Sequence, residues 1–164
     1  MRPRILLMIH VLFVCLGNIC RSPMAEAVFR HKVAEADLSD FILADSAGTG
    51  YWHIGEPPHQ GTRRILANKG VSDDGILSRQ ISRSDLDKFD YILTMDEANR
   101  RDVLTLGVAR GAIQPLLKYA PHLNALEVPD PYYDGSFSHV YDLIDASCEG
   151  LLKTIQTEHN FQVL

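Results

Sequence analysis

Apolar runs alternate with segments of mixed polarity along the chain, and this alternation predicts strands and helices in turn. Largely apolar segments predict strands at 5–14, 41–44, 89–94 and 112–116. The apolar run that continues through 11–14 is typical of a strand buried on both faces of a sheet. Amphipathic segments predict helices at 22–35, 58–69, 96–106 and 137–158. Strands that alternate with helices indicate an α/β fold, and we expect a three-layer αβα arrangement around a four-stranded parallel sheet.

Local signals refine the ends of these elements. Ser22 and Pro23 suit the N-cap and the first position of the first helix, with Glu26 in its first turn. Gly70 can end the second helix as a C-cap. Pro115 lacks an N–H to donate to a neighbouring strand, and it therefore places the fourth strand at an edge of the sheet. The segment 46–50 is expected to be a loop.

No internal repeat, low-complexity tract or linker divides the sequence, and we expect residues 1–164 to form one domain. Right-handed crossovers place the loops that follow parallel strands at one edge of a sheet, where such sheets bind ligands. The loop that begins at Cys15 is therefore the first place to look for a site.

The apolar run at 5–14 follows two arginines and could be taken for a signal or membrane segment. It is too short to span a bilayer, it contains His10, and no small-x-small cleavage site follows it, so we expect a buried strand. The three cysteines are an odd number without the spacing of a disulfide framework. We therefore expect a cytoplasmic protein.

The chain is mildly acidic, with a net charge of -5 and no cluster of Lys and Arg. Nucleic acids require a basic face that neutralises many phosphates, and we expect neither nucleic acid nor a membrane as a partner. Any phosphate that the protein binds must be held by a few well-placed groups.

Cys15 and Arg21, separated by five residues, lie between the first predicted strand and the first predicted helix. A loop of this length can direct successive backbone N–H groups at one centre, which forms an anion site reinforced by the helix dipole. Gly17 permits a left-handed conformation or a close approach, and the planar Arg21 side chain can hold two phosphate oxygens. These positive groups would favour a Cys15 thiolate, to which Ser22 can donate a hydrogen bond.

The run Val-Cys-Leu-Gly-Asn-Ile-Cys-Arg-Ser-Pro at 14–23 resembles the signature of the low-molecular-weight protein tyrosine phosphatases. Similar landmarks follow at 45–49, 89–96 and 130–135, and together they cover most of the chain. The resemblance implies hydrolysis of phosphotyrosine and aryl phosphates through a cysteinyl phosphate, without a metal or an organic cofactor. It implies phosphotyrosine-containing proteins as partners, and inorganic phosphate or other oxyanions as inhibitors. In the loop it assigns phosphate binding to Leu16, Gly17, Asn18, Ile19, Cys20 and Ser22.

By the same resemblance, Cys15 is the nucleophile, Arg21 the phosphate clamp and Asp130 the general acid. The residues alone give Asp130 a modest preference, because the flanking Pro129 and Pro131 stiffen the segment that presents it. Asp134 is the rival carboxylate, and we expect it in a turn with Gly135.

Aromatic residues near these segments suit a deep cleft for an aryl group. Trp52 lies in the loop after the second predicted strand, and Tyr132 and Tyr133 follow Asp130. The alternative is that they anchor loops or pack in the core, which is as good an account as the cleft for Tyr133. The resemblance also allows Tyr132 and Tyr133 to be phosphorylated themselves.

The resemblance assigns Asn18 the support of the loop, and here the chain departs from the family. Many members carry a His that buttresses this Asn, shortly before the segment that matches 78–80. Residues 71–77 contain no His, and neither Gln80 nor its polar neighbours offer a clear replacement. The support of the loop must therefore differ.

Other functions remain open on the sequence. Thiol-linked arsenate reductases share a similar loop, but they need further cysteines, whereas Cys148 stands alone. Phosphoarginine phosphatases tend to carry Thr at the position of Ile19. A metal site fits less well, because Cys15, Cys20, His10 and His31 do not have the spacing of a structural zinc site. A catalytically inert phosphate-binding module also fits less well, because it would not need both a nucleophile and a general acid such as Asp130. Cys20 has two readings, a packing residue or a reversible disulfide partner of Cys15.

Overall fold

The computed structural model describes residues 8–161, and residues 5–7 of the first predicted strand lie outside this range. The strands are β1 (Ile9–Cys15), β2 (Ile42–Gly48), β3 (Tyr91–Thr94) and β4 (Ala112–Pro115). The α-helices are α1 (Arg21–Glu35), α2 (Gln60–Asn68), α3 (Arg83–Lys88), α4 (Glu97–Leu104), α5 (Pro131–Asp134) and α6 (Phe137–Glu158). Two short 3-10 helices, η1 (Leu116–Tyr119) and η2 (Pro121–Leu123), follow β4.

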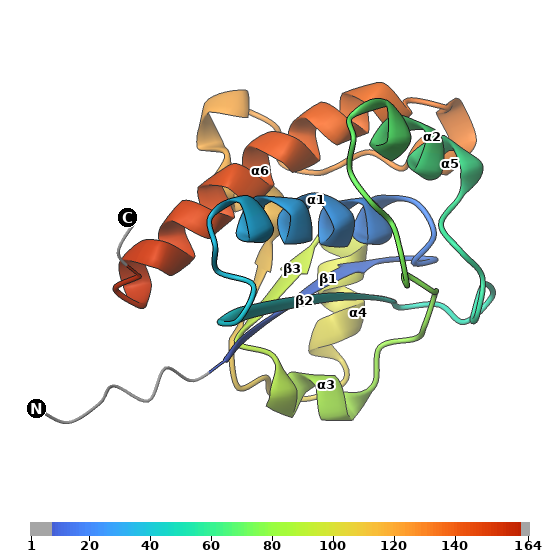
Figure 1. The fold of residues 1–164 in the computed structure, drawn as a ribbon. Helices are drawn as coiled ribbons and strands as arrows, with labels where there is room; N and C mark the ends of the chain where they lie inside the picture. The colour runs from blue at the N-terminus through green and yellow to red at the C-terminus, as the bar shows by residue number, and fades with distance from the viewer. Residues whose placement is uncertain (1–7, 162–164) are drawn as a thin grey trace, which may run out of the picture.

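The four strands form one parallel sheet in the order β2-β1-β3-β4. Helices α1, α2 and α6 cover one face, and α3 and α4 cover the other (Figure 1). Within β1, Val11 and Phe13 face the larger apolar core, whereas Leu12 and Val14 face the smaller one. Burial on both faces explains the uninterrupted apolar run, and the predicted α/β fold with a four-stranded parallel sheet is confirmed.

Several boundaries agree with the sequence pattern. Helix α6 covers the predicted range, and β4 lies at the edge of the sheet. Gly70 adopts a φ of 70° directly after Lys69, the last half-helical residue of α2. That left-handed conformation carries no steric cost for glycine, which explains why the helix ends there.

The prediction for the start of α1 was wrong. The helix begins at Arg21, one residue before the expected N-cap, and the N-cap is Cys20 without a side-chain hydrogen bond. Ser22 is inside the helix because its hydroxyl is used by Asn18 and Cys15 instead of by the helix end. Glu26 lies in the second turn and is buried, so it is not a first-turn acid that favours the helix dipole.

Two further elements differ from expectation. β2 continues to Gly48, which places part of the predicted loop 46–50 in the sheet. Its residues Ser46, Ala47 and Gly48 have weak strand propensity, and pairing along β1 holds them in place. Helix α3 was missed, although Ser82 and Asp85 form a capping box at its start. None of the helices within residues 8–161 is long and apolar enough to cross a membrane.

Helix α6 packs closely against Tyr119 of η1 at Gly150. A Cβ atom added at Gly150 would lie 1.9 Å from the carbonyl oxygen of Tyr119. We expect Gly150→Ala to lower the free energy of unfolding by about 1–3 kcal/mol, because overpacking outweighs the better helix propensity of alanine. Urea denaturation measures this change. The control is Lys153→Ala, at an exposed position of the same helix, and its free energy of unfolding should stay within about 0.5 kcal/mol of the wild type. A Gly150→Ala protein that is more stable than the wild type would contradict the close contact between Gly150 and Tyr119.

Candidate active site

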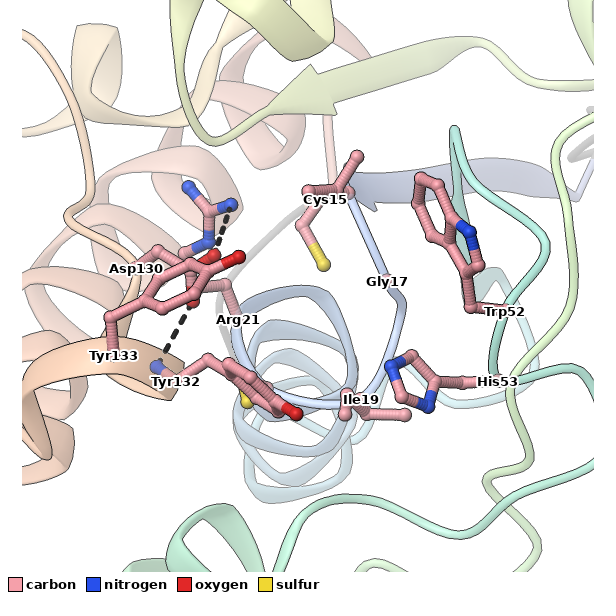
Figure 2. Close-up of a pocket in the computed structure, with 11 residues that line it drawn as sticks. Cys15, Gly17, Ile19, Arg21, Trp52, His53, Asp130, Tyr132 and Tyr133 are labelled. Carbon is pink, nitrogen blue, oxygen red and sulfur yellow. Dashed lines mark hydrogen bonds and ion pairs between the residues drawn. The ribbon is translucent and has the colours of Figure 1, made fainter.

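A cavity of about 260 Å³ opens at the carboxyl end of β1, beside the N-terminus of α1. The Cys15 sulfur faces into it, between the Arg21 and Asp130 side chains and the Trp52 ring (Figure 2). Ser22 Oγ lies 3.0 Å from this sulfur, and the Asn18 N–H donates to it at 3.3 Å. The lining residues are Cys15, Leu16, Gly17, Ile19, Cys20, Arg21, Trp52, His53, Asp130, Tyr132 and Tyr133.

The carbonyl groups of the loop are engaged by the surrounding chain. Five carbonyl oxygens accept hydrogen bonds, at 2.7–3.1 Å, from residues outside the loop. The pairs are Cys15 with Thr49, Leu16 with Gly50, Gly17 with Ser78, Ile19 with His59, and Cys20 with Thr62. The backbone N–H groups of Gly17, Ile19 and Cys20 have no acceptor among residues 8–161. Because the carbonyls are held by outside segments, these N–H groups remain available to an anion at the cavity.

The left-handed residue of the loop is Asn18, with a φ of 55°, and Gly17 is not left-handed. Asparagine tolerates this conformation better than most residues do. The expectation of a left-handed Gly17 is therefore wrong, and the glycine leaves room for the His53 ring, which a Cβ atom there would approach to 3.2 Å. Asn18 and Ser22 are buried beneath the loop and do not line the cavity.

The Asn18 side chain is held by three hydrogen bonds. Its Oδ1 accepts from the Arg79 N–H at 2.9 Å, and its Nδ2 donates to Ser22 Oγ at 2.7 Å and to Ser46 Oγ at 2.9 Å. These three groups hold Asn18 although residues 71–77 contain no His. Gln80 instead donates to the carbonyl oxygen of Thr49.

Arg21 is 3% exposed and is held by acceptors from distant segments. Its Nη1 donates to Asp96 Oδ2 at 2.7 Å and to the Val128 carbonyl oxygen at 3.0 Å, and its Nη2 lies 3.5 Å from Asp130 Oδ2. Burial opposes the charge, but the neighbouring Cys15 and the two carboxylates outweigh it and raise the pKa of Arg21. The guanidinium therefore remains a fixed positive charge at the cavity.

Asp96 was missed as part of this site. The sequence indicated it only as the acidic start of a helix, and it is indeed the N-cap of α4, where Oδ1 accepts from the Asn99 N–H at 2.8 Å. Its other oxygen binds Arg21. The available signal was its position directly after a buried parallel strand, at the edge of the sheet where ligands bind.

Asp130 is the N-cap of α5, with Pro131 at the first helical position. Its Oδ1 accepts from the Tyr132 N–H at 3.1 Å, which fixes the carboxylate while Oδ2 faces Arg21. Asp134 is the last residue of α5, directly before the turn at Gly135: its Oδ1 accepts from the Ser136 N–H at 3.0 Å, and Gly135 has a φ of 73°. Of the two carboxylates, Asp130 is the one that lines the cavity.

The rim of the cavity is aromatic. Trp52, 61% exposed, stacks on Tyr51 with ring centroids 5.4 Å apart, and Tyr132 meets Tyr133 edge-on at 5.2 Å. Tyr133 lines the cavity although it is 81% exposed. Figure 2 shows the Trp52 ring on one side of the opening and the two tyrosines on the other.

His53 also lines the cavity, and the sequence did not indicate it. Its Nδ1 lies 2.6 Å from Glu56 Oε2, which orients the ring against Gly17 in the loop at the end of β1 (residues 15–20, called the phosphate loop below). The only available signal was its place beside Trp52 in the same loop. Within residues 8–161, no group of three or more His, Cys, Asp and Glu side chains is arranged to hold a metal ion.

Comparisons with known proteins agree with this geometry. A family model described as low molecular weight phosphotyrosine protein phosphatase matches residues 10–161. YfkJ of Bacillus subtilis, a low molecular weight protein-tyrosine-phosphatase, is 53% identical over 153 residues, which are 92% of this chain and 98% of that protein. The chain belongs to the low molecular weight phosphotyrosine protein phosphatase family.

Solved structures of relatives have the same fold. The crystal structure of YfkJ matches with a TM-score of 0.90 and covers 92% of this chain and 96% of that chain. A protein tyrosine phosphatase from Entamoeba histolytica matches at 34% identity with a TM-score of 0.82, covering 91% and 96% of the two chains. A Drosophila arginine phosphatase matches at 35% identity with a TM-score of 0.83, covering 89% and 97%. The predicted family and enzyme class, a protein tyrosine phosphatase, are confirmed.

The three thiols of this phosphatase differ in environment. Burial, followed by the neighbouring Cys15 and Asp130, raises the pKa of Cys20 to about 12, and burial also raises the pKa of Cys148. At pH 7 only roughly one Cys20 in 10⁵ is then a thiolate. We expect iodoacetamide to label Cys15 selectively, as measured by fragmentation mass spectrometry of the peptide that carries Cys15 and Cys20. Labelling of Cys20 at a comparable rate would contradict this assignment.

Proposed function

We propose that this phosphatase hydrolyses phosphotyrosine and other aryl phosphates through a cysteinyl-phosphate intermediate. In this proposal Cys15 is the nucleophile, Arg21 the phosphate clamp, and Asp130 the general acid and then the general base. The observation that carries the proposal is the convergence of these three side chains on one cavity, although Arg21 and Asp130 are 109 residues apart in sequence. The family membership supports the same assignment.

In the first step, the Cys15 thiolate attacks phosphorus in line with the leaving phenolate. Arg21 and the free N–H groups of residues 17, 19 and 20 stabilise the charge on the three equatorial oxygens. Asp130 transfers its proton to the phenolate oxygen as the phosphorus–oxygen bond breaks. Ser22 donates a hydrogen bond to the sulfur, which stabilises the thiolate before attack and again when it leaves.

In the second step, Asp130 takes a proton from water, and the water oxygen attacks the cysteinyl phosphate. The phosphorus–sulfur bond breaks, inorganic phosphate forms, and the Cys15 thiolate is restored. The loop residues Leu16, Gly17, Asn18, Ile19, Cys20 and Ser22 share the phosphate site: several contribute backbone N–H groups at the cavity, whereas Asn18 and Ser22 support it from below.

The aromatic rim supports a preference for aryl phosphates. Trp52 on one side and Tyr132 with Tyr133 on the other can enclose an aryl ring above the Cys15 sulfur (Figure 2). Stacked and edge-on contacts with a phenyl ring favour phosphotyrosine over phosphoserine, whose shorter side chain would reach neither wall. Phosphotyrosine-containing proteins are therefore the proposed partners.

We also propose that the reaction needs no metal or organic cofactor, because Arg21 and the loop N–H groups supply the positive charge at the phosphate. A cytoplasmic location is consistent with three free cysteines. The match of the family model over residues 10–161 supports a single phosphatase domain.

The catalytic roles can be separated by three substitutions. Cys15→Ser should abolish hydrolysis of an aryl phosphate at mildly acidic pH without added metal. Asp130→Ala should lower kcat by about 10²–10⁴-fold, because the phenolate must leave without a proton, yet the phosphoenzyme should still be trapped by rapid quenching. Asp134→Ala is the matched control and should leave kcat unchanged, since Asp134 is bound to Ser136 in the turn. Activity of the Cys15→Ser variant, or strict dependence on a divalent metal, would disprove this mechanism.

Phosphoarginine phosphatase is the second candidate, because one structural relative is an arginine phosphatase. Ile19 lines the cavity with an apolar side chain, which favours the aryl ring over a phosphoguanidinium. Thiol-linked arsenate reduction is disfavoured, since Cys148 is fully buried in α6 with its Sγ 3.8 Å from the Ala25 carbonyl oxygen.

Matched peptides that carry phosphotyrosine or phosphoarginine distinguish the first two candidates. We expect a higher kcat/KM for phosphotyrosine, and we expect Ile19→Thr to shift the ratio towards phosphoarginine, because the hydroxyl can pair with a guanidinium N–H. Phosphate release measures both rates. A preference of the wild type for phosphoarginine would reverse the assignment.

A further inference from the structure

Glu26 is a buried carboxylate that the proposed mechanism does not use. It lies on α1, is 5% exposed, and does not line the cavity. Its Oε1 accepts a hydrogen bond from Ser46 Oγ at 2.7 Å, and its Oε2 lies 3.4 Å from Arg30 Nη1. Burying a carboxylate costs free energy, and an acidic residue kept at such a position calls for a reason beyond packing.

Hydrogen bonds connect Glu26 to the nucleophile. Glu26 binds Ser46, Ser46 binds Asn18, Asn18 binds Ser22, and Ser22 lies against Cys15; the four contacts measure 2.7, 2.9, 2.7 and 3.0 Å. Ser46 and Asn18 are 28 residues apart in sequence, and β2 brings them together. The chain of contacts runs wholly through buried side chains.

The donor of each hydrogen bond in this series of contacts follows from Asn18 in the middle and from Glu26 and Cys15 at its two ends. Because the Arg79 N–H donates to Asn18 Oδ1, the amide nitrogen faces Ser46 and Ser22 and donates to both. Each hydroxyl can then donate one hydrogen bond. Ser46 donates to Glu26, and Ser22 has two acceptors within reach, the Cys15 sulfur at 3.0 Å and the Ala47 carbonyl oxygen at 3.5 Å, of which the sulfur is the nearer.

We propose that Glu26 is a positioning residue that acts on Cys15 through Ser46 and Asn18. By accepting the hydrogen bond from the Ser46 hydroxyl, the carboxylate keeps the lone pairs of Ser46 Oγ turned towards the Asn18 amide. The amide is thereby held in place beneath the loop, and Asn18 keeps its left-handed backbone conformation. Ser22, in turn, stays aimed at the thiolate. Glu26 and Ser46 thus support Asn18 from behind the loop. The inference rests on the proposed function only in taking Cys15 as the reactive thiol.

The charged groups around Glu26 come from three segments. Arg30 lies on α1, Asp45 on β2, and Arg79 in the segment that leads to α3. Arg79 is itself paired with Asp45 and Asp85, each at 3.0 Å. Burial raises the pKa of Glu26, while the Ser46 hydrogen bond and then Arg30 oppose that rise and favour the carboxylate.

A simple electrostatic role for Glu26 would have the opposite sign. As a buried negative charge, Glu26 would disfavour a second anion at Cys15, so that its removal would make the thiolate form at lower pH. As a positioning residue it favours the Cys15 thiolate, and its removal would make the thiolate form at higher pH. The direction of the shift therefore decides between the two roles.

The test measures the pH at which the rate of Cys15 alkylation by iodoacetamide is half-maximal. Glu26→Met keeps an unbranched side chain of similar length and removes both acceptor oxygens. We expect its midpoint to rise by about one pH unit, the effect of weakening one charge-assisted hydrogen bond. Ser46→Ala should give a similar rise, and the double variant should rise no further, because both residues act through the same contact.

Two conservative variants and one control complete the experiment. Glu26→Gln keeps an acceptor oxygen for Ser46 and should not raise the midpoint. Glu26→Asp keeps the charge but withdraws it from Ser46 and should raise the midpoint, which preserves the test if Glu26→Met does not fold. Glu35→Met, at an exposed position of α1, should leave the midpoint unchanged.

An unchanged or lowered midpoint in Glu26→Met or Glu26→Asp would overturn the inference, as would additive effects of Glu26→Met and Ser46→Ala. Alkylation requires no phosphoester substrate. Failure of this inference is therefore distinguishable from failure of the proposed phosphatase reaction, which is measured separately by phosphate release.

Discussion

The guanidinium of Arg21 is almost completely buried, and a buried positive charge is tolerated only where carboxylates and carbonyl groups surround it. Its partners Asp96, Val128 and Asp130 lie 75, 107 and 109 residues away in sequence. The N-cap of α4, the segment before α5 and the start of α1 must therefore meet at one point. Most of the geometry of the site follows from this requirement, because the cavity lies where these segments meet β1 (Figure 1).

A second constraint acts on the backbone of the phosphate loop. Five of its carbonyl oxygens are hydrogen-bonded to segments outside the loop, and Asn18 takes the left-handed conformation. The N–H groups of Gly17, Ile19 and Cys20 remain without an acceptor among the described residues, and these three residues line the cavity. In the proposed reaction they are donors that need not rearrange as negative charge develops on the phosphate.

The charges of the site are arranged in layers. Cys15 and Arg21 meet at the cavity, Asp96 and Asp130 hold Arg21, and Glu26 lies farther back behind Ser46. Carboxylates adjacent to Arg21 compensate its burial, whereas Glu26 lies behind Asn18 and is connected to Cys15 by the hydrogen bonds between them. Of these three carboxylates, Asp130 lines the cavity and Glu26 does not.

The sequence by itself determined those features that depend on neighbouring residues. The presence of a strand before Cys15 and of a loop after it, the range of α6 and the edge position of β4 all follow from the apolar pattern and local chemistry, although the exact ends of the first strand and first helix do not. Asp130 was identified mainly by resemblance, since many carboxylates look alike in sequence. Helix α3 was missed because it is short and its capping signal uses Asp.

Only the tertiary structure decided which distant groups support these local features. Asp96 and His53 lie at the site, and Ser46 and Glu26 lie behind it, because segments far apart in sequence pack together at this end of the sheet. Their residue types have ordinary roles elsewhere, as helix caps, surface groups or strand residues, and no local pattern separates the two uses. The physical reason is that periodicity and spacing report contacts within one element, whereas the pairing of a buried charge depends on the packing of all elements together.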